Sequence, residues 1–193
     1  PEDLATFVYT SGTTGPPKGV MLTHSNIWET AQMSENHIPI QGEDARAISY
    51  LPLSHIAERM LSHLLHIYYG SETWFAESID TLLADLAAVK PTYFFGVPRV
   101  WEKFYAGFQA MAAQPPKDKS EERKKNLAKK AIALGLEVTK LEQAAVGEGK
   151  KMTDAKVPLG MKLQHAALDK LVLSKIRERF GLDQCTLALS AAA

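Results

Sequence analysis

The sequence predicts an α/β fold with a mainly parallel sheet flanked by helices, followed by a helical insertion. Up to residue 95, short apolar runs alternate with helical stretches of about 10 to 12 residues. From residue 98 the chain is rich in Ala, Lys, Glu and Leu, which are strong helix formers. With 193 residues, 46% of them hydrophobic and 23% charged, the chain can bury a core.

Each element has a local signal. Strands are predicted at residues 4–9, 19–23, 47–51, 72–75, 92–95 and 186–189. Helices are predicted at residues 25–36, 56–68, 79–89 and 163–180, together with a long helical stretch at 98–146 that Pro115 and Pro116 interrupt. Ser78 can cap one helix, and Gly70 and Gly181 can end two others. Glycines and prolines at residues 146–160 predict a mobile loop.

These elements predict an α/β subdomain at residues 1–97, a helical insertion at 98–180 and a returning strand at 181–193. Lys plus Arg and Asp plus Glu both number 22, so the basic excess of a nucleic-acid binder is absent. The single cysteine, Cys185, excludes a disulfide framework and favours a reducing compartment. No apolar run is long enough for a membrane helix, so we predict a cytoplasmic protein, at most membrane-peripheral.

The strongest functional signal is the loop at residues 9–19, YTSGTTGPPKG. Its glycines permit tight turns, while its hydroxyls and Lys18 add donors and a cation, a combination that suits a polyphosphate. A flexible linker would explain the Ser, Thr and Gly content, but not the strand predicted on each side. The loop is not a Walker A motif, because Gly19 follows Lys18 and a strand follows the loop.

The run at residues 9–24, YTSGTTGPPKGVMLTH, resembles the phosphate-loop signature of the AMP-forming adenylating enzymes, such as acyl-CoA synthetases and firefly luciferase. The resemblance implies part of that family's N-terminal domain and a reaction in which a carboxylate attacks the α-phosphate of ATP, releasing pyrophosphate. It implies that Lys18 neutralises phosphate charge and that the Thr10 hydroxyl contacts Mg²⁺. The implied phosphate cradle comprises Thr10, Ser11, Gly12, Thr13, Thr14 and Gly15.

The segment at residues 51–58, LPLSHIAE, resembles the family's next motif. On that resemblance, His55 orients the acyl carboxylate or lines its pocket. Read from the residues alone, His55 is more often a helix-entry histidine bonded to backbone. His55 with Glu58, and His63 with His66, have metal-ligand spacing, but no further ligand cluster accompanies them, and we predict no metal site there.

The segment at residues 91–103, PTYFFGVPRVWEK, and the lysine-rich insertion after it resemble the long-chain acyl-CoA synthetase branch. The resemblance implies that Tyr93, Phe94 and Gly96 wall a fatty-acyl pocket; composition alone favours an ordinary buried strand. The basic stretch at residues 117–130 can attract lipid headgroups or the phosphates of coenzyme A, but its interleaved acidic residues favour a solvated helix face.

The resemblance implies ATP, Mg²⁺ and coenzyme A as cofactors or co-substrates and a long-chain fatty acid as substrate, with no nucleic-acid partner. Ala191 stands where the family usually has a glycine, so its β-carbon would narrow the approach to the purine. The 193 residues lack the family's magnesium carboxylate, its ribose-binding aspartate and its C-terminal domain with the catalytic lysine. We therefore expect a piece of a longer enzyme, inactive alone and prone to self-association, whose glycine-rich loop is poorly ordered without ligand.

Two other classes of function remain open. A non-catalytic nucleotide- or phosphate-binding module would bind ATP saturably without releasing pyrophosphate. A membrane-surface domain would bind liposomes through the helical insertion, and that binding would weaken with salt.

Overall fold

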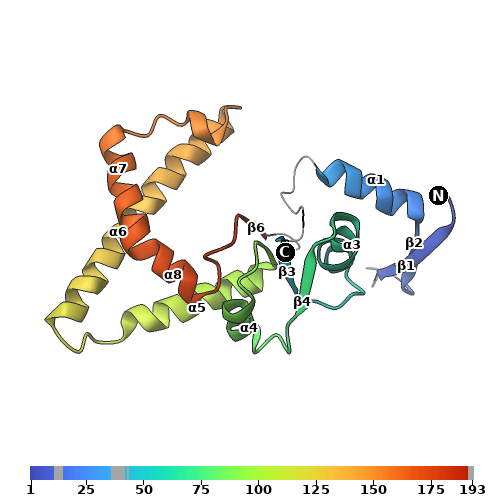
Figure 1. Ribbon diagram of the computed structural model, residues 1–193, viewed down its shortest axis with the longest axis horizontal. Helices are drawn as coiled ribbons and strands as arrows, with labels where there is room; N and C mark the ends of the chain where they lie inside the picture. Colours follow the sequence, from blue (N-terminus) through green and yellow to red (C-terminus); the bar gives the residue numbers. More distant parts are fainter. Residues whose placement is uncertain (11–14, 36–41, 43, 191–193) are drawn as a thin grey trace. The chain divides into compact units, whose positions relative to one another are not determined.

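The structure is a computed structural model that describes residues 1–10, 15–35, 42 and 44–190, with the order of elements shown in Figure 1. The chain divides into two units. One comprises Pro1–Glu102 with Phe180–Ala193, and the other comprises Lys103–Arg179. The first unit contains the described strands and the second is helical, which confirms the predicted α/β class.

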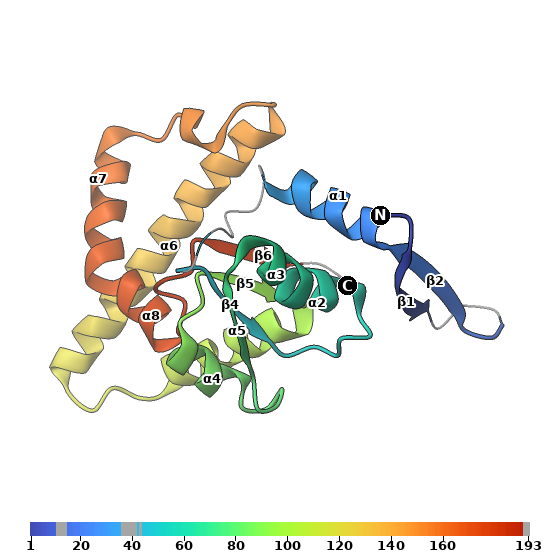
Figure 2. The ribbon, with the colours of Figure 1, turned by 45° about the vertical axis from the view of Figure 1, so that its right-hand side comes forward.

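An antiparallel hairpin begins the first unit. Strand β1 (Leu4–Thr10) pairs with β2 (Lys18–Thr23), and Thr10 lies opposite Lys18 in the register. This pair is antiparallel because a connection this short can only reverse the chain direction. Helix α1 (His24–Glu35) follows β2 directly, as Figure 2 shows.

The remaining strands form two parallel pairs. Strand β3 (Arg46–Ser49) pairs with β4 (Glu72–Phe75), and β5 (Tyr93–Gly96) pairs with β6 (Leu187–Ser190). The Thr92 amide donates to the Arg46 carbonyl at 3.0 Å, which ties the start of β5 to the start of β3. Two of the described strand pairs are thus parallel, in agreement with a mainly parallel arrangement.

Helices connect the parallel strands and cover β3. The chain from β3 to β4 forms α2 (Ile56–Arg59), a π-helical turn η1 (Met60–Leu64) and α3 (Leu65–Tyr69). Gly70 ends this helix with a φ of 69°, as predicted. Helix α4 (Leu82–Val89) and η1 both contact β3. The buried core is built from their apolar side chains and those of the strands, including Ala47, Ile48, Leu65, Leu82, Leu86, Tyr93 and Phe94.

Helix α4 begins three residues later than residue 79, where the sequence pattern placed it. Thr81 takes the N-cap position, and its hydroxyl donates to the Ser78 carbonyl at 3.1 Å. The Ser78 side chain in turn accepts the Thr81 amide at 3.2 Å. Ser78 therefore caps a turn before the helix rather than the helix itself, a common alternative for serine beside a helix start.

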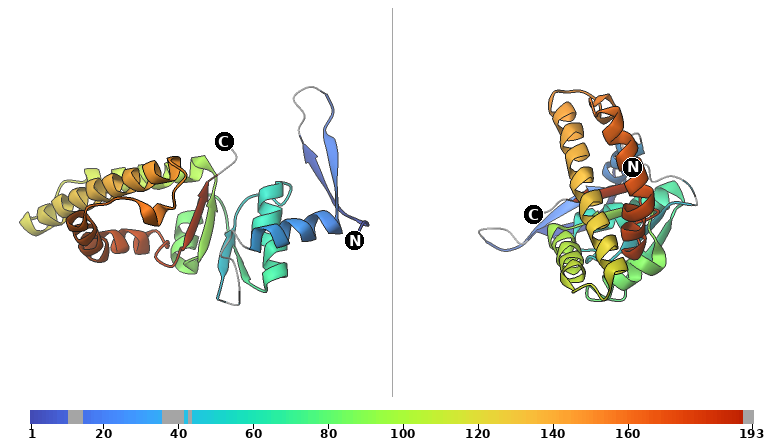
Figure 3. Two further views of the ribbon diagram at one scale, coloured as in Figure 1. Left: turned by 90° about the horizontal axis from the view of Figure 1, so that it is seen from above. Right: turned by 90° about the vertical axis from the view of Figure 1, so that its left-hand side faces the viewer.

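The second unit is a helical layer, seen clearly in Figure 3. Its helices are α5 (Pro98–Ala113), which begins in the first unit, α6 (Lys119–Gly147), α7 (Leu159–Leu168) and α8 (Ser174–Arg179), joined by the short turns η2 (Met152–Asp154) and η3 (Asp169–Leu173). Asp118 caps α6 by accepting the Glu121 amide at 2.8 Å. Helix α6 packs against α7 and η3.

The last helical segment starts at Leu159 instead of residue 163. Pro158 takes its N-cap position, and its carbonyl accepts the Lys162 amide at 3.0 Å. A proline is tolerated there because the first amides of a helix have no partner within the helix. Residues 146–160, predicted as a loop, also contain the end of α6 and the turn η2.

Large apolar side chains are exposed in the first unit. Tyr9 and Met21 on the hairpin are 67% and 65% exposed, and Phe75 on β4 is 75% exposed. Apolar side chains gathered on strands favour association. The self-association expected from the sequence stays a prediction.

Candidate phosphate- and acyl-binding site

The predicted phosphate loop lies at the closed end of the hairpin. Thr10 ends β1 and Lys18 begins β2, and the Thr10 hydroxyl donates to the Lys18 carbonyl at 3.4 Å. Gly15 has a φ of 119°, a backbone conformation that residues with a β-carbon rarely adopt. Ser11, Gly12, Thr13 and Thr14, and with them the predicted order of the loop, lie outside the described residues. The hairpin thus holds both described ends of the loop next to each other.

Lys18 is exposed at the first position of β2. Within the described ranges its ammonium group has no carboxylate partner. A lysine next in sequence to a segment rich in hydroxyls and glycines is a chemically suitable contact for a phosphate. The described part of the hairpin therefore agrees with the phosphate role predicted from the sequence, without testing it.

His55 lies at the N-cap of α2, just past the carboxyl end of β3. Its Nδ1 accepts the Ala57 amide at 3.3 Å, and its own amide donates to the Pro52 carbonyl at 2.9 Å. His55 is exposed to solvent. His55 therefore performs the helix-entry role that the residues alone favoured, and that role does not prevent contact with a carboxylate.

Arg59 joins the hairpin to the segment that carries His55. Its guanidinium donates to the Phe7 carbonyl at 3.2 Å, and it also bonds the Thr6 hydroxyl. Its Nε donates to the Leu53 carbonyl at 2.9 Å. Sequence reasoning missed this contact, because its partners are 52 or 53 residues away along the chain.

Tyr93 and Phe94, predicted to wall an acyl pocket, are 2% and 1% exposed. The Tyr93 hydroxyl bonds His66 and the Leu61 carbonyl. The Phe94 ring packs against Tyr50, at 6.0 Å between ring centroids, and against Trp101, at 5.4 Å. Both side chains are thus part of the interior. Gly96 is the last residue of β5, and the Tyr50 hydroxyl bonds the residues on either side of it.

His66 is a buried histidine that the sequence pattern did not single out for this role. It is 4% exposed, stacks on Tyr93, and its Nδ1 lies 2.6 Å from the Ser71 hydroxyl. Burial lowers the pKa of His66 below its ordinary value of 6.5, and a backbone hydrogen bond at Ser71 offsets part of that decrease. The folded state therefore favours the neutral imidazole.

The depressed pKa of His66 predicts a loss of stability in mild acid. The unfolded chain binds this proton at a higher pH than the folded chain does, so the stabilisation present above pH 6.5 decreases as the pH falls below it. We expect the urea midpoint to fall between about pH 7 and pH 5, and to fall less in His66→Gln. His63→Gln, at an exposed histidine of η1, should keep the wild-type slope. Equal slopes in all three proteins would contradict the assignment.

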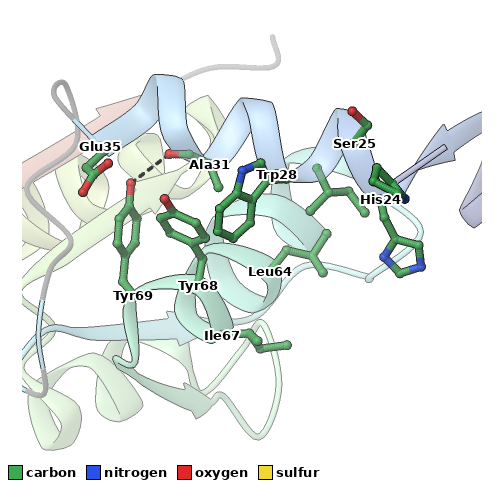
Figure 4. A pocket seen from close by; sticks show the side chains of 11 residues that line it. His24, Ser25, Trp28, Ala31, Glu35, Leu64, Ile67, Tyr68 and Tyr69 are labelled. Atoms are coloured by element: carbon green, nitrogen blue, oxygen red, sulfur yellow. Dashed lines mark hydrogen bonds between the residues drawn. The ribbon is translucent and has the colours of Figure 1, made fainter. Parts of the chain in front are cut away.

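A pocket lies between α1 and the η1–α3 segment, as Figure 4 shows. Trp28 and Tyr68 meet edge to face in it at 4.9 Å between ring centroids, and the Tyr69 hydroxyl donates to the Ala31 carbonyl at 3.1 Å. Its remaining lining includes His24, Ser25, Glu35, Leu64 and Ile67. None of the described residues predicted for the phosphate or acyl site lines this pocket.

Other candidate features are structurally ordinary. Among the described residues no cluster of three or more His, Cys, Asp or Glu side chains is placed to hold a metal ion. Thr10 supplies one neutral oxygen, so a Mg²⁺ there would need further oxygen ligands such as phosphates and water. Burial raises the pKa of the Cys185 thiol, which makes it a weak nucleophile. In the described helices, no segment combines the length and hydropathy needed to span a membrane.

The basic stretch of residues 117–130 contains the N-cap and the first turns of α6. Most of its side chains are exposed, and Lys125 bonds the Ala112 and Gln114 carbonyls at the end of α5. Such bonds complement the unpaired carbonyls of a helix C-terminus. Contact with lipid or coenzyme A through this stretch stays a prediction.

An antiparallel hairpin that carries the glycine-rich segment, combined with parallel strand pairs and connecting helices, defines an α/β protein. The sequence profile of the AMP-binding enzyme family matches residues 1–185. The chain therefore belongs to the AMP-binding enzyme family.

Relatives agree with this assignment. The long-chain-fatty-acid–CoA ligase ACSBG2 of Xenopus laevis is 43% identical over 100% of this chain and 25% of its own length. ACSBG2 of Rattus norvegicus is 39% identical over 97% of this chain and 26% of its own length. A solved malonyl-CoA ligase with methylmalonyl-CoA and AMP bound is 28% identical, with a TM-score of 0.51 over 56% of this chain and 24% of that one. The chain spans about a quarter of the length of these relatives.

Proposed function

We propose that the complete protein carrying this chain is an ATP-dependent long-chain fatty-acid–CoA ligase. It would convert a fatty acid and ATP to an acyl-adenylate and pyrophosphate, and then transfer the acyl group to coenzyme A with release of AMP. The observation that carries the proposal is the similarity over the whole chain to long-chain-fatty-acid–CoA ligases. The hairpin that sets Thr10 opposite Lys18 supports it, because it supplies donors and a cation at one place.

In this proposal the residues of the hairpin bind the triphosphate. Thr10, Gly15 and the intervening loop residues cradle the β- and γ-phosphates, and Lys18 stabilises the negative charge of the departing pyrophosphate. The Thr10 hydroxyl would be one ligand of the Mg²⁺ that accompanies ATP. His55 orients the acyl carboxylate, and the strand end at Gly96 forms part of the acyl pocket, with Tyr93 and Phe94 supporting it from the interior.

The test is an ATP–pyrophosphate exchange assay on the complete protein, with and without a long-chain fatty acid. Exchange that depends on the fatty acid supports the proposal. This chain alone is the control, because the 193 residues supply only part of the family's site and should give no exchange above background. Saturable ATP binding by the complete protein without any exchange would instead favour a non-catalytic nucleotide-binding module.

His55→Ala in the complete protein is expected to slow adenylate formation by about 10-fold or more, with little change in the KM for ATP. The reason is that His55 acts on the carboxylate rather than on the nucleotide. Rapid-quench measurement of acyl-adenylate formation gives the rate, and saturation with ATP gives the KM.

The control for His55→Ala must separate chemistry from helix capping, since His55 Nδ1 accepts the Ala57 amide. His55→Asn keeps a side-chain oxygen that can cap α2, a role in which asparagine is among the best residues. It should restore stability without restoring the rate. A normal rate in His55→Asn would assign His55 to capping alone.

A further inference from the structure

Tyr50 links the two segments that carry the proposed acyl site. It lies between the end of β3 and the segment that contains His55. Its hydroxyl donates to the Phe95 carbonyl at 3.1 Å and accepts the Val97 amide at 3.1 Å, so it binds the backbone on both sides of Gly96. Its own amide donates to Glu58 Oε1 at 3.2 Å, and Glu58 is 1% exposed. One side chain therefore connects two strand ends that are far apart in sequence.

The backbone at Gly96, the last residue of β5, is also bound by Trp101. The indole Nε1 donates to the Gly96 carbonyl at 2.9 Å. A β-carbon at Gly96 would lie 2.6 Å from that nitrogen, so the indole and the glycine backbone fit only without a side chain. Tyr50 and Trp101 together bind the Phe95 carbonyl, the Gly96 carbonyl and the Val97 amide, and so hold the end of β5 in place.

The Tyr50 hydroxyl keeps the proton that it donates in its hydrogen bond. Burial and the nearby Glu58 carboxylate raise its pKa, although the bond from the Val97 amide lowers it in part. The hydroxyl therefore stays protonated at neutral pH and remains a donor to the Phe95 carbonyl. The hydroxyl both donates to and accepts from the backbone at the end of β5. Its loss therefore leaves the Phe95 carbonyl and the Val97 amide without this partner.

We propose that Tyr50 is a positioning residue for the acyl substrate: it fixes the strand end at Gly96 relative to the segment that carries His55. Tyr50 is not proposed to contact the reacting atoms. The inference rests on the proposed function, because it assumes that His55 and Gly96 border the same acyl group. Small displacements of a positioning element reduce productive binding strongly, even when the chemical groups are retained.

The test uses Tyr50→Phe in the complete protein, with Tyr69→Phe as a matched control. Both variants lose one hydroxyl that bonds a backbone carbonyl, but the Tyr69 hydroxyl bonds Ala31 and Ser34 instead of the strand end at Gly96. We expect Tyr50→Phe to raise the KM for fatty acid by about 10-fold while the KM for ATP stays within twofold. Tyr69→Phe should change neither KM, although both variants should lower the urea midpoint.

Deuterium uptake followed by mass spectrometry gives a readout independent of activity. The peptide covering residues 94–101 should exchange faster in Tyr50→Phe than in Tyr69→Phe, because the Val97 amide loses its acceptor. If Tyr50→Phe does not fold, Trp101→Phe removes the indole bond to the Gly96 carbonyl and should give the same selective rise in the KM for fatty acid.

The outcomes are separable. An active wild type with equal fatty-acid KM values in the Tyr50 and Tyr69 variants overturns the inference and leaves the proposed function intact. Equal rises in both KM values of Tyr50→Phe also overturn it, because they indicate a general structural defect. A wild-type protein without fatty-acid-dependent exchange overturns the proposed function, and this inference with it.

Discussion

Lys18→Ala in the complete protein is expected to lower fatty-acid-dependent ATP–pyrophosphate exchange by about 10-fold to 1,000-fold, equivalent to about 1.4 to 4 kcal/mol. Lys18 is the exposed first residue of β2 and follows the loop in sequence. Its ammonium group has no carboxylate partner in the described part of the chain. Its removal takes away a cation proposed to stabilise the departing pyrophosphate. The loss should therefore appear in the rate of adenylation.

Two controls accompany Lys18→Ala. Lys162→Ala removes an exposed lysine from α7 and should retain the wild-type rate. Lys18→Arg keeps the positive charge and should recover part of the activity, although the planar guanidinium does not reproduce a point charge. Wild-type exchange by Lys18→Ala would remove the proposed role of this residue.

Gly181→Ala is expected to destabilise the first unit by about 3 to 5 kcal/mol. Gly181 has a φ of 69°, and a β-carbon built on it would lie 2.0 Å from the Leu86 carbonyl oxygen. That oxygen also accepts the Lys90 amide at the end of α4. The substitution therefore strains the backbone and pushes α4 away from the segment that leads to β6.

Urea unfolding measures this effect, with Gly107→Ala as the matched control. Gly107 lies inside α5 and a β-carbon there would meet no atom within 4 Å. Alanine is the better helix former, so Gly107→Ala should be neutral or stabilising by up to about 1 kcal/mol. Similar midpoints for the two variants would show that α4 can move away from Gly181 at little cost.

The sequence predicted the elements better than their pairing. Gly70 and Gly181 were expected to end helices, and both have a φ of 69°. Strand β4 has the bounds that its apolar run predicted. The antiparallel pairing of the first two strands was not predicted, because alternation of strands and helices identifies strands without saying which of them are neighbours.

The candidate site was located through its motifs, whereas the contacts that hold it were not. The motifs that contain Lys18 and His55 are each continuous in the sequence. The bonds of Tyr50 to residues 95 and 97 join positions 45 and 47 apart, and no periodicity in the sequence records them. Tyrosine and arginine at such positions look like any other polar side chain until the strands are placed side by side.

The pairing of β5 with β6 has a consequence for how the chain acquires its structure. Thr186 bonds the Thr92 carbonyl across a separation of 94 residues, and the entire helical unit lies between the two strands. Closing so long a loop carries a larger entropic cost than forming helices from local contacts, and pairs distant in sequence form slowly. The helices of the second unit therefore form early, and the β5–β6 pair completes late. During synthesis, β5 must wait without its partner until residues 187–190 leave the ribosome, so its edge is open throughout translation of the insertion.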